Sequence, residues 1–157
     1  DVDGKYRGLD QRIHQADGFT NYTTFSLWDT YRAEHPFLNL FYPEQNASMI
    51  ESMLQHYNQS VHHMLPIWSH YANENWCMIG YHAVSVLADA VIKNNPYLKH
   101  TKRYLEAAHS TANQRFYEGL GAYLDDGFVA EDVSGSSVSK TLEYAYDDWC
   151  IAQMAKK

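Results

Sequence analysis

The sequence predicts an all-α fold, built as one compact domain of about five helices. Apolar residues recur at helical spacing in five segments, and proline, glycine or asparagine punctuates the gaps between them. The 157 residues are enough to bury a sizeable core. Short and long connections alternate along the chain, which is typical of helices that pack in pairs in a bundle or toroid.

The N-terminal part of the chain is the least regular. Residues 1–23 show no sustained period and contain several turn formers, so we expect a loop with one short strand. Aromatic residues at helical spacing predict a first helix at about 24–34, which Pro36 is expected to end. The apolar run FLNLFY before Pro43 is too short for a capped helix, so we expect a buried linker there.

Three helices are expected in the middle of the chain. One begins at Pro43, where the missing N–H of proline costs no hydrogen bond, and its apolar stripe extends to Tyr57. Two more are expected at about 76–93 and 97–116. The first of these two has a polar side formed by His82, Ser85, Asp89 and Lys93.

The last predicted helix covers about 138–155. Residues 117–137 before it are punctuated by glycine and end in SGSS, so we expect an extended segment and a region suited to a helix N-cap. The helix itself places five apolar residues at near-ideal spacing on one face. They are Val138, Leu142, Ala145, Trp149 and Ala152.

Composition excludes several classes of function. The chain has 12 Lys and Arg against 19 Asp and Glu, a formal net charge of −7, which argues against a nucleic-acid partner. No apolar run is long enough to span a membrane, and the polar start DVDGKYRGLD resembles the interior of a longer chain rather than a signal peptide. Cys77 and Cys150 are far apart in helical apolar contexts, so we expect buried free thiols.

Aromatic residues are unusually frequent, with 13 Tyr, four Trp and six Phe beside nine His. Such residues fill cores well. Aromatic rings in an acidic chain also suit sugar binding, because apolar sugar faces stack on rings while carboxylates and amides bind the hydroxyls. Composition alone leaves both interpretations open.

The segment 62–76, HHMLPIWSHYANENW, breaks the helical period and is expected to be a loop. Its histidines do not have a spacing that fixes a zinc site. Two interpretations remain: a loop packed by its own aromatic residues, or the edge of a ligand cleft. In the second, Asn73, Glu74 and Asn75 would bind ligand hydroxyls.

Acidic residues also concentrate in the last helix, where Glu143 and Asp147 are one turn apart and Asp148 follows. Like charges at this spacing cost a few tenths of a kcal/mol, so we expect another group to offset them. Lys140 could do so locally, or the acids could face a polar cleft. Acids one turn apart on one helix cannot flank a glycosidic bond, so they suit sugar-hydroxyl binding better than acid–base catalysis.

Four long strings carry a family resemblance that covers essentially the whole chain. They resemble the catalytic region of glycoside hydrolase family 92, the calcium-dependent bacterial exo-acting α-mannosidases. The strings are YRGLD (6–10), ADGFTNYTTFSLWDTYRAEHP (16–36), MLPIWSHYANENWCMIGYHAVSVLADA (64–90) and SGSSVSKTLEYAYDDWCIAQMA (134–155).

The resemblance implies that residues 1–157 are part of one (α/α)6 toroidal catalytic domain, which a β-sandwich domain precedes in full-length members. It implies inverting hydrolysis of a terminal, most often α-1,2-linked, mannose by a general-acid Glu and a general-base Asp, with calcium bound to the sugar. The family strings for the acid, the base and the calcium ligands are absent here and are expected beyond residue 157. The isolated segment is therefore expected to be inactive and to contain no metal ligands.

The resemblance also implies which residues form the sugar pocket. Asp29 would accept mannose hydroxyls, Trp28 would shape the pocket, and Arg32 could hold the carboxylate ionised. The alternative is a simple intrahelical pair of Asp29 and Arg32. The full set of expected substrate-binding residues is Trp28, Asp29, Arg32, Glu74, Asn75, Trp76, Asp147 and Asp148.

The expected partners are a mannose-containing N-glycan or mannan oligosaccharide and the remainder of the catalytic domain. By the same resemblance we expect a periplasmic, cell-surface or secreted bacterial protein. A helical carbohydrate-binding or scaffold module without catalysis is the alternative function.

Overall fold

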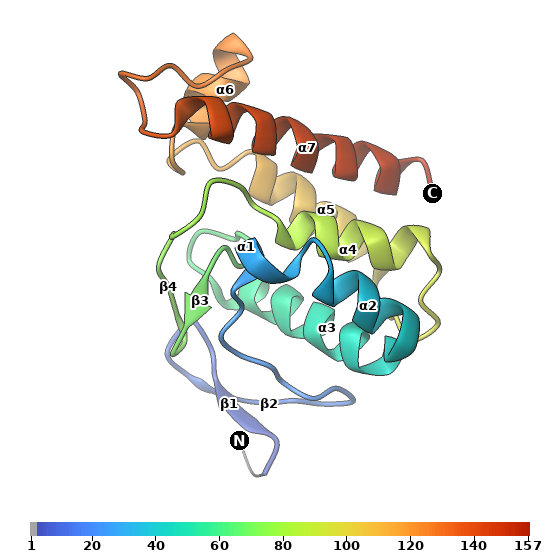
Figure 1. The fold of residues 1–157 in the computed structure, drawn as a ribbon. Helices are drawn as coiled ribbons and strands as arrows, with labels where there is room; N and C mark the ends of the chain where they lie inside the picture. Colours follow the sequence, from blue (N-terminus) through green and yellow to red (C-terminus); the bar gives the residue numbers. More distant parts are fainter. Residues whose placement is uncertain (1–2) are drawn as a thin grey trace.

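The computed structural model describes residues 3–157, and helices dominate it (Figure 1). The helical fold class predicted from the sequence is confirmed. The helices are α1 (Leu27–Thr30), α2 (Glu34–Phe41), α3 (Pro43–Gln59), α4 (Ala83–Ile92), α5 (Thr101–Ala112), α6 (Leu120–Asp126) and α7 (Ser137–Ala155). Within the described part of the chain, no helix is long and apolar enough to cross a membrane.

Helix α4 lies at the centre of the helical layers. It packs against α7 on one side and against α2 and α3 on the other, with α5 also in contact (Figure 1). Its first six residues, Ala83–Ala88, are all buried. Ser85 and the preceding His82, which belong to the polar side expected for this helix, are both buried rather than exposed to solvent.

Two small antiparallel hairpins accompany the helices. The strands β1 (Lys5–Arg7) and β2 (Ile13–Gln15) pair with Lys5 opposite Gln15, where one short strand was expected. The expectations for residues 1–2 lie outside the described residues. The strands β3 (Ser69–His70) and β4 (Asn73–Glu74) form a second hairpin inside the segment expected to be a loop.

The buried linker expected before Pro43 is wrong. Helix α2 begins at Glu34 and continues through Pro36, which is the third helical residue and so has no intrahelical N–H bond to lose. The predicted first helix is correspondingly short, since only the single turn of α1 forms. The apolar run is largely exposed, at Phe37, Leu40 and Phe41.

The segment 117–137 is not simply extended, because it contains α6. Gly119 and Gly127 border this helix with φ of 82° and 80°, backbone angles that glycine adopts at little cost. Of the two free cysteines, Cys150 is buried as expected, whereas Cys77 is exposed.

Buried tyrosines supply much of the core, and four of them donate their hydroxyl to a partner, as buried phenols usually do. Tyr117 donates to the Met78 carbonyl at 2.6 Å, and Tyr144 donates to the Glu118 carbonyl at 2.9 Å. These bonds tie the chain before α4 and the start of α6 to each other and to α7. The aromatic richness of the sequence is thus partly a structural property.

Candidate functional site

Asp147 of α7 is completely buried against the start of α4. Its Oδ2 accepts the main-chain N–H of Tyr81 at 2.8 Å, and its Oδ1 lies 3.0 Å from Nδ1 of His82. Burial raises the pKa of Asp147, while its hydrogen bond with His82 opposes that rise. A carboxylate at the N-terminus of α4 is also favourably placed for the helix dipole. Asp147 therefore joins the two helices.

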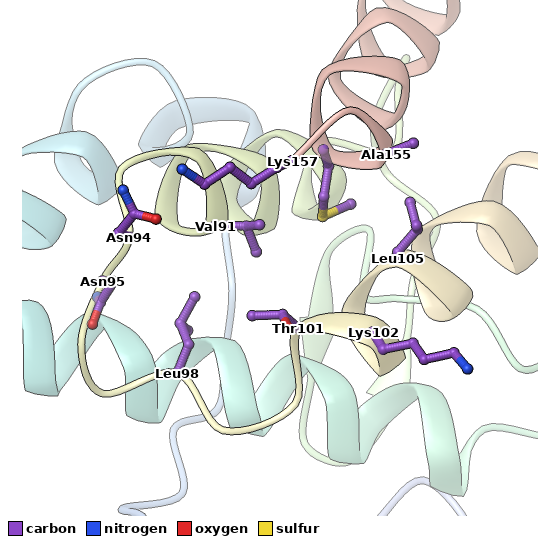
Figure 2. Close-up of a pocket in the computed structure, with 10 residues that line it drawn as sticks. Val91, Asn94, Asn95, Leu98, Thr101, Lys102, Leu105, Ala155 and Lys157 are labelled. Atoms are coloured by element: carbon purple, nitrogen blue, oxygen red, sulfur yellow. The ribbon is translucent and has the colours of Figure 1, made fainter.

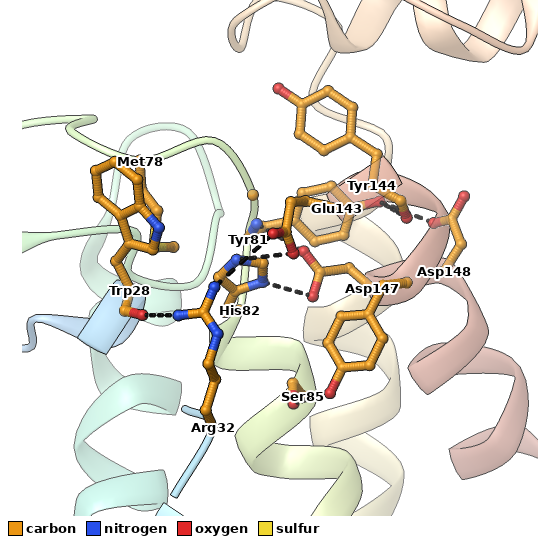
Figure 3. Close-up of polar contacts among 12 residues, drawn as sticks. Trp28, Arg32, Met78, Tyr81, His82, Ser85, Glu143, Tyr144, Asp147 and Asp148 are labelled. Atoms are coloured by element: carbon orange, nitrogen blue, oxygen red, sulfur yellow. Dashed lines mark hydrogen bonds and ion pairs between the residues drawn. The ribbon is translucent and has the colours of Figure 1, made fainter. Parts of the chain in front are cut away.

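The polar contacts continue from His82 toward α1 (Figure 3). Nε2 of His82 lies 3.5 Å from Oε2 of Glu143, but no hydrogen bond in the described structure satisfies this nitrogen. Nη2 of Arg32 lies 3.9 Å from Oε1 of the same Glu143, and Nη1 of Arg32 donates to the Trp28 carbonyl at 2.6 Å. The ring of Tyr31 stacks on His82 with centroids 4.0 Å apart. One contiguous cluster thus links α1, α4 and α7.

Asp148, the third acid of α7, accepts hydrogen bonds from two tyrosines. Tyr81 Oη donates to Oδ1 at 2.8 Å and Tyr123 Oη donates to Oδ2 at 3.1 Å. Lys140 does not offset these acids, because its Nζ pairs with Glu118 at 2.5 Å. The local explanation by Lys140 is therefore wrong. Sugar binding by Asp147 and Asp148 remains a prediction, although both oxygens of each carboxylate have partners in the chain.

Glu74 organises the loop that carries it. Its Oε1 accepts main-chain N–H groups of Trp68, Asn75 and Trp76 at 2.7, 3.0 and 3.1 Å, and its Oε2 accepts that of Ile67 at 2.8 Å. The carboxylate is 5 % exposed. These contacts fit the interpretation of a loop held by its own polar groups, and substrate binding by Glu74 remains a prediction.

Asn75 and Trp76 lie on the same loop but differ in exposure. Asn75 is exposed, whereas Trp76 is half-buried with its ring centroid 5.5 Å from Phe116 and 5.8 Å from Tyr117. Trp76 thus anchors the loop to the segment between α5 and α6. Roles for both in sugar binding remain predictions.

His56 of α3 lies beneath this loop, with Nε2 3.6 Å from Oε2 of Glu74. Burial lowers the pKa of His56 from 6.5 to about 3, because the charged imidazolium would lose its hydration. The imidazole is therefore neutral at pH 7. The main partners of the Glu74 carboxylate are therefore the four main-chain N–H groups.

We expect acid to destabilise the fold through His56. The unfolded chain takes up a proton near pH 6.5, whereas folded His56 takes one up only near pH 3, so stability decreases as pH falls through this window. The expected loss between pH 6.5 and 5 is about 2 kcal/mol. Urea unfolding of the full-length protein at both pH values measures it.

The variant His56→Gln should reduce this pH dependence, and the exposed His109→Gln should retain it. An identical pH dependence in the wild type and in His56→Gln would contradict the assignment.

Asp29 lies on the single turn of α1, in its first turn, where a carboxylate is favourable. It does not pair with Arg32 in the described structure, since the guanidinium contacts the Trp28 carbonyl and Glu143 instead. The expected stabilisation of Asp29 by Arg32, and the alternative of a simple intrahelical pair, are both wrong. Ser26 donates to Oδ2 of Asp29 at 2.5 Å. Trp28 and Asp29 are exposed and free to meet a ligand.

The structure thus brings Arg32 and Asp147 into one cluster, with the main chain of Trp28, and places Glu74, Asn75 and Trp76 on a separate loop. Sequence reasoning missed His82 as a site residue, and it named Glu143 among the acids of the last helix without including it in the expected substrate-binding set. The only local signal was the acid spacing in LEYAYDD, since His82 and Tyr81, the partners of Asp147, lie 65 and 66 residues away.

Asp29 lines neither of two sizeable pockets, and only the first of them borders the cluster. One of about 480 Å³ is lined by Tyr31, Arg32, Ser85, Tyr146 and Trp149, among others. Another, of about 520 Å³, lies between the C-terminal ends of α4 and α7 and the start of α5 (Figure 2). Its lining includes Leu98, Lys102 and Lys157 but none of the expected sugar-binding residues.

Residues 3–157 contain no group of three or more His, Cys, Asp or Glu side chains that could hold a metal ion.

The described residues form an α-helical domain in which helices pack in pairs around a buried polar cluster. The chain belongs to glycosyl hydrolase family 92, because the model of that family's catalytic domain matches residues 1–157. The family predicted from the four sequence strings is confirmed.

Two solved structures support this assignment. Both are of the family GH92 alpha-mannosidase BT3965 from Bacteroides thetaiotaomicron, one of them in complex with mannoimidazole. Each is 58% identical to this chain and has a TM-score of 0.95, and the match covers 99% of the present chain. This chain spans 20% and 21% of those two chains. A comparison with curated proteins gave no match.

Proposed function

We propose that the full-length protein is an exo-acting α-mannosidase that removes terminal mannose from glycans. The observation that carries this proposal is the 58% identity, at a TM-score of 0.95, to an alpha-mannosidase whose structure holds mannoimidazole. The substrates would be mannose-containing N-glycans or mannan oligosaccharides, and the preferred linkage α-1,2. We further propose a periplasmic, cell-surface or secreted location.

In this proposal the reaction is an inverting hydrolysis within an (α/α)6 toroid, to which residues 1–157 contribute one part. A general acid protonates the leaving oxygen while a general base activates water on the opposite face of the sugar. We place both residues, and the ligands of a calcium ion, outside residues 1–157. The segment alone would then be inactive and would supply one wall of the sugar pocket.

The chemistry of this wall rests on Trp28 and Asp29. A carboxylate accepts hydroxyl protons strongly, and an exposed indole offers a flat apolar face to the sugar ring. The two side chains are adjacent on α1 and are both exposed. Glu143 and Arg32 extend the polar surface behind them toward His82.

Asp29→Asn in the full-length enzyme tests the proposal. The substitution keeps the volume of the side chain but replaces a charged acceptor with a neutral amide. Hydrogen bonds to charged groups contribute about 1.5–3 kcal/mol, so kcat/KM for an aryl α-mannoside should fall about ten- to a hundredfold. The melting temperature should change little, because the carboxylate is exposed and bonds only to Ser26 among the described residues.

Asp126→Asn is a suitable control, since this exposed acid of α6 has no side-chain partner in the described structure. An unchanged kcat/KM in Asp29→Asn would show that Asp29 does not bind the substrate. Binding of mannosides without any turnover by the full-length protein would instead favour a carbohydrate-binding module.

A further inference from the structure

We propose that Ser26 and Trp68 are positioning residues for Asp29. They hold one oxygen of its carboxylate and leave the other oriented for a sugar hydroxyl. The inference rests on the proposed function, because it assumes that Asp29 binds the substrate. It adds two residues to the sugar site that the four family strings contain but to which no role has been given.

The direction of each hydrogen bond is fixed by chemistry. Nε1 of Trp68 lies 3.1 Å from Oγ of Ser26, and an indole N–H can only donate. Oγ of Ser26 is therefore the acceptor in this contact, so its own hydrogen is free for another partner. That partner is Oδ2 of Asp29 at 2.5 Å, to which the Ser26 hydroxyl donates.

Trp68 can impose an orientation because its own main chain is fixed. Its N–H donates to Oε1 of Glu74 at 2.7 Å, and the N–H of Ile67 donates to Oε2 at 2.8 Å. The loop held by Glu74 thus reaches α1 through the indole, across 42 residues of sequence. The carboxylate of Asp29 takes its orientation from that loop rather than from the single turn of α1.

Ser26 does not make the capping hydrogen bond that a serine at its position usually makes. It occupies the N-cap position of α1, where a serine oxygen ordinarily accepts a main-chain N–H of the first turn. No such side-chain capping bond forms here, because the hydroxyl bonds to Trp68 and Asp29 instead. Removing the hydroxyl therefore takes away no capping bond.

The second carboxylate oxygen remains available. Within residues 3–157, Oδ1 of Asp29 receives no hydrogen bond from the chain, and the residue is exposed. A carboxylate with one oxygen bound by the protein and the other free is a preorganised acceptor for a hydroxyl. Its side chain is already ordered before the sugar binds, so binding does not have to meet that entropic cost.

The test is a double-mutant cycle in the full-length enzyme, with kcat/KM for 4-nitrophenyl α-mannoside in saturating calcium as the readout. Ser26→Ala and Trp68→Phe should each lower kcat/KM about tenfold. Either substitution added to Asp29→Asn should lower kcat/KM by less than twofold further, because both act through the carboxylate. Ser26→Thr, which keeps a hydroxyl, should restore most of the activity.

Ser139→Ala, at an exposed serine of α7 outside the site, is the matched control and should match the wild type. If Asp29→Asn itself has no effect, the proposed sugar-binding role of Asp29 fails. If Asp29→Asn lowers kcat/KM but the losses from Ser26→Ala and Trp68→Phe multiply with it, or are absent, the positioning role is overturned while the proposed function stands. Circular dichroism of each variant checks that it is folded.

Discussion

Asp147→Ala is expected to lower the free energy of unfolding by about 2–6 kcal/mol, because two buried donors each lose their acceptor at a cost of about 1–3 kcal/mol. The substitution leaves the N–H of Tyr81 and Nδ1 of His82 buried without an acceptor. It also removes the group that joins α7 to the start of α4. Because α4 contacts most other helices, the loss should spread beyond one interface.

Urea unfolding of the full-length protein, followed by tryptophan fluorescence, measures this effect. Asp147→Asn should cost less than Asp147→Ala, since its amide oxygen can still accept the Tyr81 N–H. Asp126→Ala removes an exposed acid without a partner and should change the free energy of unfolding by less than about 0.5 kcal/mol. Equal stability of Asp147→Ala and the wild type would show that the buried contacts contribute no net free energy.

Helix α7 shows how far hydrophobic periodicity can predict structure. The predicted span 138–155 agrees with the observed Ser137–Ala155 to within a residue. The apolar stripe, however, is the exposed face here, with Val138, Leu142 and Trp149 all more than half exposed. The buried face of the helix includes Lys140, Tyr144 and Asp147, two of which are charged or polar residues that no apolar pattern could select. We expect the stripe to pack against further helices of the full-length domain, and this stays a prediction.

Two sequence-based predictions were wrong because the helix boundaries differ from those expected: that Pro36 ends a helix, and that Asp29 pairs with Arg32. Pro36 was expected to end a helix, but the helix begins only at Glu34, so proline occupies the first turn, where it is tolerated. The spacing of Asp29 and Arg32 suits a pair within one continuous helix. Because α1 ends at Thr30, Arg32 lies beyond it and meets Glu143 from α7 instead.

The sequence could predict only those parts of the candidate site whose residues lie close together in the chain. The sequence drew attention to Trp28 and Asp29 through a family resemblance, and to the acids of α7 through their spacing. It could not show that Trp68 contacts Ser26 or that His82 contacts Asp147, because such contacts depend on how distant segments pack. Glu74, read as a candidate hydroxyl ligand, is committed to four main-chain groups of its own loop.

Glu74→Gln is expected to loosen this loop and to lower the free energy of unfolding by about 3 kcal/mol. Glutamine has nearly the same shape but only one acceptor oxygen. Whichever way its amide is oriented, an NH₂ group must face either the N–H of Ile67 or those of Trp68, Asn75 and Trp76. Neutral His56 provides no compensating charge at pH 7.

Hydrogen exchange locates the effect more sharply than global stability does. Amides of peptides covering 67–76 should exchange faster in full-length Glu74→Gln than in the wild type, while amides of α5 should not. Because the loop positions Trp68, kcat/KM should also fall, and adding Trp68→Phe should lower it little further. The exposed Glu131→Gln, which has no side-chain partner in the described residues, should leave both readouts unchanged. Wild-type exchange rates across 67–76 in Glu74→Gln would mean that the geometry of the loop is set by the packing of Trp76 against Phe116 and Tyr117, rather than by the Glu74 carboxylate.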